Sequence, residues 1–306
     1  MDKGVKKKNN LYNIKHELIG RYSVTTFGVF LVLLTLCIVA FIVFQGLATF
    51  YQSHRSPAEF LFSTVWKPDR DISEGGPSIG SLIFITGSVI VCMISILIST
   101  PFSLSTSIFM TEISPKFGER ILRPAIEIFV GIPSVVYGWI GLSVLVPFIR
   151  KYIGGLGFSV LAASLVLAIM IFPTIASVAS DALRSVSKDF REASYALGAT
   201  RWQTIRKVVI PAALPGILTG IVLGLARAFG EALAVQMVLG NSIRIPGSLL
   251  DSTVNLTSII TMDMGNSAEG TEWYNALWSM ALILLIMSFV FIVLIRMLAG
   301  RRAVKQ

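Results

Sequence analysis

The 306-residue sequence has few charged residues and few of the side chains that most enzymes use. Charged residues make up 14% of the chain, whereas soluble globular proteins carry about a quarter. There are only two histidines and two cysteines, and Cys37 and Cys92 each stand in the middle of an apolar run with no CxxC spacing nearby. We therefore expect no metal site, no disulfide and no catalytic residue in this chain.

Hydrophobic residues, by contrast, make up 54% of the chain and gather in long runs. A helix needs roughly 20 apolar residues to cross the hydrocarbon core of a bilayer. Six stretches meet this length, so the sequence predicts an all-α polytopic membrane protein with six transmembrane helices. The predicted spans are Phe27–Leu47, Ile79–Thr100, Pro124–Val146, Phe158–Val178, Ala212–Gly240 and Ala276–Leu298.

The basic residues are distributed unevenly between the loops that separate these runs. The formal net charge is +9, but the charges alternate with long apolar runs, which argues against a nucleic-acid-binding protein. Of the 26 Lys and Arg residues, 19 lie in segments on the side of the termini, six on the other side and one, Arg227, within a span. Cytoplasmic loops carry the excess of Lys and Arg. We therefore expect both termini in the cytoplasm and the protein in the cell membrane, surrounded by lipid.

The longest loop on the expected cytoplasmic side, Asp181–Pro211, has the pattern of two short helices. The first carries an apolar stripe with residues three or four positions apart, and Gly198 supplies the usual end of a helix. Thr200 followed by Gln203 forms a capping box that starts a second helix, which Pro211 is expected to end. The residues of the stripe are Leu183, Val186, Phe190, Ala193 and Leu197.

Periodicity alone leaves two interpretations of this hairpin open. It can lie on the membrane surface, where Arg201, Arg206 and Lys207 suit anionic lipid, or it can dock into a partner protein. Its sequence resembles the EAA loop of ABC-importer permeases, in which Glu-Ala-Ala is followed at fixed spacing by a glycine, two aliphatic residues and a proline. The matching residues are Glu192, Ala193, Ser194, Gly198, Val208, Ile210 and Pro211, with Ser194 in place of the second alanine.

The resemblance implies the type I ABC importer permease fold and a hairpin that fits a cleft in a separate ATPase subunit. ATP chemistry belongs to that partner, because this sequence contains no GxxxxGK[ST] phosphate loop. We therefore expect no cofactor in this chain, with Mg-ATP bound by the partner ATPase, and no enzymatic activity of its own.

Two charged residues, Arg227 and Glu231, lie within the fifth predicted span. An Arg near the bilayer centre costs roughly 2.5–3.5 kcal/mol, so such residues generally serve a function. On a continuous helix the two residues pair on one face, which also carries glycines that let another helix approach closely. Either the pair ties two helices together, or Arg227 lines an anion pathway and Glu231 holds its guanidinium in position. The glycines are Gly216, Gly220 and Gly224.

The third predicted span carries a second group of candidate pathway or gate residues. Glu127, Gly131 and Ser134 share one face of a helix that Pro133 is expected to kink. The Gly-Ile-Pro sequence suits a hinge in a span that moves. Glu127 can equally be a surface residue near the cytoplasmic headgroups.

Two segments narrow the resemblance further. RAFGEALAVQMVLGN in the fifth span and GIPSVVYG in the third resemble the phosphate-specific (Pst) ABC transporter permeases, more closely the PstC type than the PstA type. This resemblance implies a permease for inorganic phosphate that pairs with a PstA-type permease, a dimer of a PstB-type ATPase and an extracytoplasmic PstS-type phosphate-binding protein. The binding protein is expected to dock on the outer loops, chiefly residues 48–78 and 241–275.

The chain accordingly divides into four parts along its length. The basic start, MDKGVKKKNN, precedes an apolar run too long for a usual signal peptide, so we interpret that run as a retained helix. The expected parts are a basic cytoplasmic tail (1–26), the first helix and outer loop (27–78), a permease core of five helices (79–299) with its coupling loop at 181–211, and a short cytoplasmic tail (300–306).

Three other functions fit parts of this pattern. The same architecture can carry another oxyanion, such as molybdate or sulfate. A passive anion channel would need no ATPase. An intramembrane enzyme would need a nucleophile and a base within the spans, and no such pair is evident in the sequence.

Overall fold

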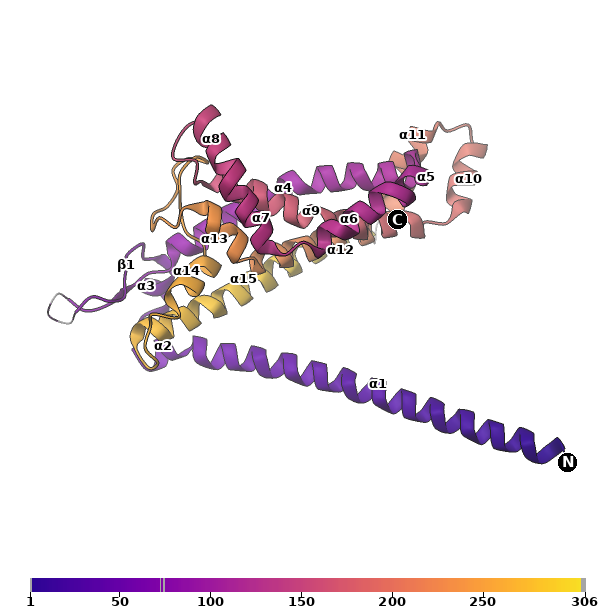
Figure 1. Cartoon of the computed structure of the whole chain (residues 1–306), viewed down its shortest axis with the longest axis horizontal. Helices are drawn as coiled ribbons and strands as arrows, with labels where there is room; N and C mark the ends of the chain where they lie inside the picture. Colours follow the sequence, from indigo (N-terminus) through magenta and orange to yellow (C-terminus); the bar gives the residue numbers. More distant parts are fainter. Residues whose placement is uncertain (1, 72, 74, 304–306) are drawn as a thin grey trace.

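The computed structural model describes residues 2–71, 73 and 75–303, and Figure 1 shows a long bundle of helices. Among these residues, six helices are long and apolar enough to cross a membrane, which confirms the predicted all-α polytopic fold. The six spans are Gly20–Tyr51, Leu82–Ile113, Ser134–Tyr152, Val160–Ser185, Arg201–Gly230 and Glu272–Met297.

Most spans are built from more than one helical segment, and within the described part of the chain four π-helical turns join α-helical segments. A small antiparallel hairpin, in which Trp66 pairs with Ile79, follows the first helices. The α-helices are α1 (Asp2–Gly46), α2 (Ala48–Tyr51), α3 (Pro57–Phe62), α4 (Leu82–Ile108), α5 (Pro115–Phe117), α6 (Arg123–Gly131), α7 (Ser134–Ile140), α8 (Val146–Tyr152), α9 (Val160–Ser185), α10 (Lys188–Ala196), α11 (Arg201–Thr204), α12 (Ile210–Gly230), α13 (Leu233–Leu239), α14 (Leu256–Asp263) and α15 (Glu272–Ala303). The strands are β1 (Trp66–Lys67) and β2 (Ser78–Ile79), and the π-helical turns are η2 (Phe109–Ile113), η3 (Gly118–Leu122), η4 (Gly141–Leu145) and η5 (Ile205–Val209).

The central helix of the bundle is α9, which packs extensively against both α4 and α12. Serines on one face of α4 donate hydrogen bonds to carbonyl oxygens of α9. Small hydroxyl side chains let two backbones approach closely and supply hydrogen bonds that lipid cannot. The donors and acceptors are Ser95 and Ser164 (3.1 Å), Ser103 and Phe172 (3.1 Å), and Ser107 and Ala176 (2.8 Å).

The contact between α9 and α12 follows the glycine face that the sequence predicts. A Cβ atom placed on Gly224 would lie 2.6 Å from Cγ1 of Ile175, and one placed on Gly216 would lie 2.4 Å from Cβ of Ala182. Gly220 faces Val178 between these two contacts. Side chains larger than hydrogen would therefore push the two helices apart, which confirms that these glycines serve close packing.

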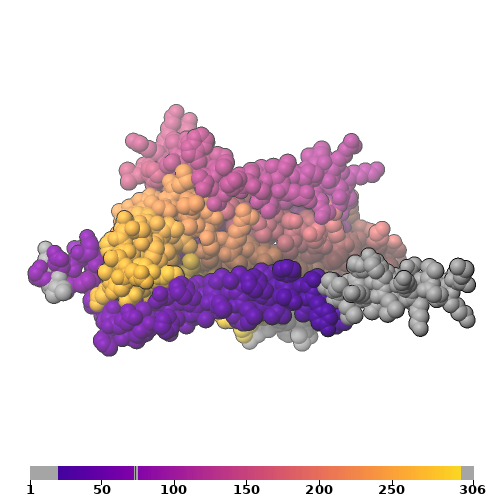
Figure 2. All heavy atoms as spheres, turned by 60° about the horizontal axis from the view of Figure 1, so that its bottom comes forward, coloured from indigo at the N-terminus to yellow at the C-terminus, as the bar shows by residue number. Residues whose placement is uncertain are grey.

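The first helix, α1, lies outside the bundle and contacts α15 near its C-terminal end. There Phe41 meets Trp278 edge-on with ring centroids 5.2 Å apart, and the Ser279 hydroxyl donates to the carbonyl oxygen of Gly46 (2.7 Å). Figure 1 shows the rest of α1 diverging from the bundle, and Figure 2 shows it as a band along one face. From Gly20 onward, where its side chains are described, most large apolar side chains of α1 are exposed, as expected of a helix that lies in lipid.

The two ends of the bundle carry different elements. Figure 1 shows the first turns of α1 and the last turns of α15 at the same end as α10 and α11, while β1, α8 and α14 lie at the other end. Helix α1 already begins at Asp2, so residues 2–26, expected as a tail, continue the first helix. In the expected tail 300–306, α15 extends to Ala303, and residues 304–306 lie outside the described residues.

The third span differs from its prediction. Instead of a kinked helix over Pro124–Val146, the chain breaks completely between α6 and α7, because Ile132 and Pro133 both have extended backbone conformations. The residue before a proline disfavours the helical region, which explains a break here rather than a kink. The membrane-length helix begins after the break, at Ser134, so the prediction that Glu127, Gly131 and Ser134 share one helix face is wrong.

The fifth span differs at both of its ends. The prediction that Pro211 ends a separate helix is wrong, because helical structure continues from Arg201 to Gly230. The π-helical turn η5 ends at Val209, two residues before this proline, and its altered hydrogen-bond pattern accommodates a residue without an N–H donor. At the other end α12 stops at Gly230, and α13 is a separate helix.

The N-terminal part of α4 packs so closely on the loop before α14 that a single added methyl group should destabilise the fold. A Cβ atom on Gly87 would lie 2.2 Å from the carbonyl oxygen of Val254, which belongs to the backbone and cannot rotate away. We expect Gly87→Ala to lower stability by about 1–3 kcal/mol, the usual cost of overpacking. The midpoint of thermal unfolding in detergent measures this effect. Gly28→Ala is the control, because nothing lies within 4 Å of its Cβ position; equal midpoints for the two variants would contradict the packing.

Candidate functional site

The loop between α9 and α12 is a hairpin of two helices joined by a glycine turn. Helix α10 is followed by Gly198 with a left-handed φ of +79°, which a side chain would strain. Thr200 then accepts a hydrogen bond from the N–H of Gln203, and the Gln203 side chain accepts one from the N–H of Thr200. The predicted sequence of helix, glycine turn and capping box is confirmed.

The apolar stripe predicted for the first arm of this hairpin is divided. Helix α9 ends at Ser185, and α10 starts anew after Ser187, whose hydroxyl accepts from the N–H of Asp189. Leu183 and Val186 are therefore buried against the bundle, so the prediction of one continuous stripe is wrong. The remaining residues of the predicted stripe are exposed: Phe190 is 59% exposed, Leu197 is 89% exposed, and Ala193 between them is exposed as well.

The residues that match the EAA pattern lie in three places on the hairpin. Glu192 and Ala193 are exposed on α10. The hydroxyl of Ser194, which replaces the usual alanine, lies 2.9 Å from the hydroxyl of Thr204 and so links the two arms. Val208, Ile210 and Pro211 form the partly buried base of the second arm.

An arginine that the sequence did not single out fixes the hairpin to the bundle. Arg191 of α10 forms two hydrogen bonds to the carboxylate of Glu112 in η2, from Nε (3.3 Å) and from Nη2 (2.6 Å). It also donates to the carbonyl oxygens of Leu183 (2.9 Å) and Val186 (2.6 Å) at the end of α9. The last carbonyl groups of a helix have no partner within that helix, and here the guanidinium supplies one. A single side chain thus joins α10, η2 and the end of α9. Nothing local in the sequence pairs two residues that are 79 positions apart.

Within the membrane-spanning part, Arg227 lies in the last turn of α12 and is half-buried. Its Nη1 donates to the hydroxyl of Thr174 on α9 (3.0 Å), and its charge also acts on the hydroxyl of Tyr137 on α7. Among the residues that the structure describes, no carboxylate lies within ion-pair distance of Arg227. The structure therefore brings Arg227 into contact with the Thr174 hydroxyl, a partner that sequence reasoning missed.

The predicted pairing of Arg227 with Glu231 is wrong. The helix ends one residue before Glu231, whose extended backbone (φ −79°, ψ 122°) turns it away from the helix face. Its carboxylate is buried and accepts from the N–H of Ala234 (3.1 Å) in the first turn of α13. The hydroxyl of Thr257 donates to its carbonyl oxygen (2.9 Å). Glu231 thus stabilises the break between α12 and α13 rather than orienting the guanidinium.

The other candidate residues lie around the break between α6 and α7. Glu127 is exposed and pairs with Arg123 (3.2 Å) one turn earlier in α6. Gly131 ends α6, Pro133 lies in the break, and Ser134 begins α7. The Tyr137 hydroxyl donates to the carbonyl oxygen of Phe129 (2.8 Å) across the break and braces it.

The two segments expected as outer loops, 48–78 and 241–275, are joined to each other. The indole N–H groups of Trp66 and Trp273 both donate to the Asp263 carboxylate (3.3 Å each). Burial raises the pKa of Asp263, although these two donors oppose the shift. Together the two segments form one surface at the end of the bundle opposite the hairpin (Figure 1).

A helical membrane bundle that carries a stiff exposed hairpin, and no phosphate loop of its own, has the features of an ABC importer permease. The chain belongs to the family described as the inner membrane component of binding-protein-dependent transport systems, whose sequence pattern matches residues 103–304. The protein is thus a multi-pass component of the plasma membrane, as the six apolar runs of the sequence predict.

Named relatives extend this similarity over most of the chain. The chain is 51% identical over 289 residues to "Probable ABC transporter permease protein YqgH" of Bacillus subtilis, covering 94% of this chain and 92% of the relative. It is 33% identical over 311 residues to "Phosphate transport system permease protein PstC" of Pasteurella multocida, covering 95% and 93%. The PstC protein of Xylella fastidiosa (strain 9a5c) is 34% identical over 268 residues, covering 81% and 80%.

Solved structures support the same fold. A bacterial ABC transporter for import of the polysaccharide alginate aligns with a TM-score of 0.54 at 15% identity, covering 72% of this chain and 79% of that chain. An inward-facing MetNI methionine ABC transporter aligns with a TM-score of 0.50 at 22% identity, covering 70% and 90%. The predicted type I ABC importer permease fold is confirmed.

The bonds of Arg191 should determine how rigidly the hairpin is held. Arg191→Ala leaves the Glu112 carboxylate, which is only 9% exposed, without its partner and should cost about 3 kcal/mol. We expect faster amide hydrogen exchange in α10 and unchanged exchange in the buried part of α9. Lys188→Ala is the control, because Lys188 is an exposed residue of the same helix. If both variants exchange equally in α10, Arg191 does not anchor the hairpin.

Proposed function

We propose that this chain is a permease subunit through which inorganic phosphate enters the cell, driven by ATP hydrolysis on a separate subunit. Similarity to proteins named as PstC phosphate permeases over 81–95% of the chain supports this cargo. The structural observation that carries the proposal is Arg227, a half-buried cation inside the membrane region with no carboxylate partner among the described residues.

A free guanidinium in this position suits an oxyanion. Its planar fork can donate two parallel hydrogen bonds to one phosphate, and Thr174 holds only one of its nitrogens. A carboxylate in contact with Arg227 would compete with the passing anion. The phosphate pathway is thus proposed at Arg227, and Glu231 contributes by fixing the end of α12 that presents it.

The break between α6 and α7 is proposed as a moving part of this pathway. Hinges are a few residues at the ends of elements, and the chain here has extended backbone at Ile132 and Pro133. Gly131 and Ser134 flank the break, and Tyr137 joins it to the surroundings of Arg227. Movement of α6, which carries Glu127, would therefore change the surroundings of Arg227.

The partners follow from the same proposal. The hairpin, with its exposed Phe190 and Leu197, docks into a PstB-type ATPase dimer that binds Mg-ATP, and both termini lie on this cytoplasmic side. A PstA-type permease completes the pathway. A PstS-type phosphate-binding protein docks on the outer segments 48–78 and 241–275 that meet at Asp263.

Replacing the proposed phosphate contact should stop transport without disturbing assembly. Arg227→Gln removes the charge and the fork, so uptake of labelled phosphate should fall at least about a hundredfold, the loss of roughly two charge-assisted hydrogen bonds. Co-purification with the other subunits should remain unchanged. Arg120→Gln is the control, because it removes an exposed arginine outside the spans. If Arg227→Gln takes up phosphate at the wild-type rate, Arg227 is not part of the phosphate pathway.

The exposed apolar residues of the hairpin should be needed for binding the ATPase. Exchanging both Phe190 and Leu197 for Ser should lower co-purification of the ATPase about tenfold or more, because buried apolar contacts of this size are worth about 1.5–3 kcal/mol each. Ile243→Ser, a change at an exposed residue of the opposite end, should leave it unchanged. Equal retention of the ATPase by all variants would argue for a hairpin that lies on lipid.

Competition separates phosphate from the other oxyanions. In reconstituted vesicles, uptake of labelled phosphate should be suppressed by excess unlabelled phosphate and resist equal amounts of sulfate or molybdate. If one of those anions suppresses phosphate uptake and is itself taken up, the chain is still a permease subunit, but its cargo is that anion.

A further inference from the structure

The chain between α4 and α6 makes a tight turn at the same end of the bundle as the hairpin (Figure 1). Residues 109–122, which comprise η2, α5 and η3, form this α5 turn. Its shape is fixed from within, because a Cβ atom on Gly118 would lie 2.5 Å from the carbonyl oxygen of Met110. The N–H of Gly118 also donates to the carbonyl oxygen of Ser114 (2.8 Å). The α5 turn therefore has one preformed shape.

Both arms of the hairpin are bonded to the α5 turn. Arg191 of α10 donates to the carboxylate of Glu112 (2.6 Å). Arg201, the first residue of α11, donates to the backbone carbonyl oxygens of Glu112 and Ile113 (3.0 Å to Ile113). Hydrogen bonds from a charged guanidinium are among the stronger ones in proteins. A protein that binds the hairpin therefore has the α5 turn beside it in a fixed position.

The α5 turn exposes large apolar side chains that the bundle does not cover. Phe117 is 44% exposed and Ile121 is 51% exposed, and both lie beyond the end of the span Leu82–Ile113. The Phe117 ring packs edge-on against Phe109, with ring centroids 6.3 Å apart, which limits its movement. Ordered apolar side chains that lie next to a span rather than within it favour contact with a protein over contact with the lipid core.

A positive charge accompanies these apolar side chains. Lys116 in α5 is exposed. The two carboxylates of the turn are bound elsewhere, Glu112 by Arg191 and Glu119 by Arg184. The charge of Lys116 is therefore not neutralised within the turn. An apolar centre with a charged rim is the usual composition of a protein–protein interface.

We infer that the α5 turn is a second contact surface for the ATPase subunit, which binds it together with the hairpin. The inference rests on the proposed function, in which the hairpin docks into that subunit. The occupant follows from continuity, because Arg191 and Arg201 join the turn to the hairpin. The ATPase should offer an apolar recess for Phe117 and a carboxylate near Lys116. The lipid headgroup layer is the competing environment, and the test separates the two.

Protection of single cysteines tests this contact in the complete importer. Cys37 and Cys92 are replaced by Ala so that only one introduced thiol reacts, at Phe117→Cys, Leu197→Cys or Arg21→Cys. A membrane-impermeant maleimide is applied to inside-out vesicles before and after the ATPase is stripped off. Phe117→Cys should react at least about tenfold more slowly with the ATPase bound, because a site occupied about nine-tenths of the time is free for only the remaining tenth.

The other two positions distinguish the possible results. Leu197→Cys reports whether the hairpin docks, and Arg21→Cys, exposed on the diverging helix α1, should react equally in both states. If Leu197→Cys is protected and Phe117→Cys is not, the inference is overturned and the docking of the hairpin stands. If Phe117→Cys is unreactive even without the ATPase, the turn lies in lipid and the inference is overturned. If neither position is protected, the proposed docking of the hairpin fails as well.

Substitutions in the α5 turn should also weaken the complex. F117S/K116E should lower co-purification of the ATPase about tenfold or more, because apolar burial is lost and a charge at the rim is reversed. K116E alone changes only an exposed side chain, so it separates loss of the contact from misfolding; its effect should be smaller and should decline at high salt. Wild-type retention of the ATPase by both variants would overturn the inference.

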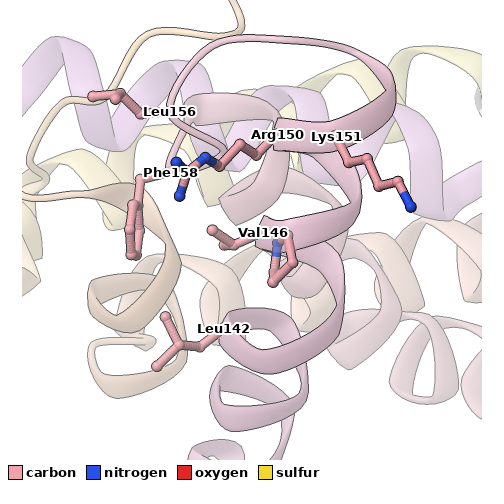
Figure 3. A pocket seen from close by; sticks show the side chains of 7 residues that line it. Leu142, Val146, Arg150, Lys151, Leu156 and Phe158 are labelled. Carbon is pink, nitrogen blue, oxygen red and sulfur yellow. The ribbon is translucent and has the colours of Figure 1, made fainter.

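Matched control positions lie at the opposite end of the bundle. Figure 3 shows Leu156 and Lys151 beside a pocket of about 450 Å³ at the end of α8, with the Lys151 side chain directed away from it. Leu156 is 70% exposed, and Lys151 is exposed as well. L156S/K151E makes the same kinds of change and should retain the ATPase as the wild type does. If this control loses the ATPase to the same extent as F117S/K116E, the effect is not specific to the α5 turn and the inference is overturned.

Discussion

A guanidinium inside a membrane must find compensation for the water it has lost, and the rest of this structure depends on how Arg227 does so. A carboxylate would be the cheapest partner, but the described residues supply only the Thr174 hydroxyl and the neighbourhood of Tyr137. Charged side chains at membrane depth generally face the bundle interior or a water-filled path. The uncompensated charge is thus what makes an anion a fitting cargo.

The surrounding helices are built so that this residue can be held in position. Glycines of α12 and serines of α4 draw both helices onto α9, so the helix that carries Thr174 is fixed from two sides. Where the backbone leaves helical structure, side chains satisfy the freed groups: Glu231 caps α13, and Tyr137 bridges the break after α6. Irregular backbone at membrane depth is tolerated only where such partners exist.

The hairpin that follows the C-terminal end of α9 is held by the hydrogen bonds of a second arginine. Arg191 binds the last carbonyls of α9 and the carboxylate of Glu112 together, so a force on α10 reaches α9 and the end of α4 directly. Ser194 and Thr204 join the two arms. A loosely attached loop could not transmit a rotation of a motor subunit to the spans.

Local features of this fold could be read from the sequence, and contacts between distant segments could not. The capping box of Thr200 and Gln203 depends on three residues of spacing, and the six spans depend on continuous apolar runs; both were predictable. The pairing of Arg227 with Glu231 assumed a helix that in fact ends at Gly230, because the capping of α13 and the Thr257 contact favour a break there. Thr174, 53 positions before Arg227, and Glu112, 79 before Arg191, carry no local signal.

The most direct test is the stimulation of ATP hydrolysis in the complete reconstituted importer, measured as the anion loaded on the binding protein is varied. The account predicts that the phosphate-loaded binding protein raises the rate of hydrolysis and that sulfate or molybdate does not. Stimulation by another anion, with no response to phosphate, would contradict it.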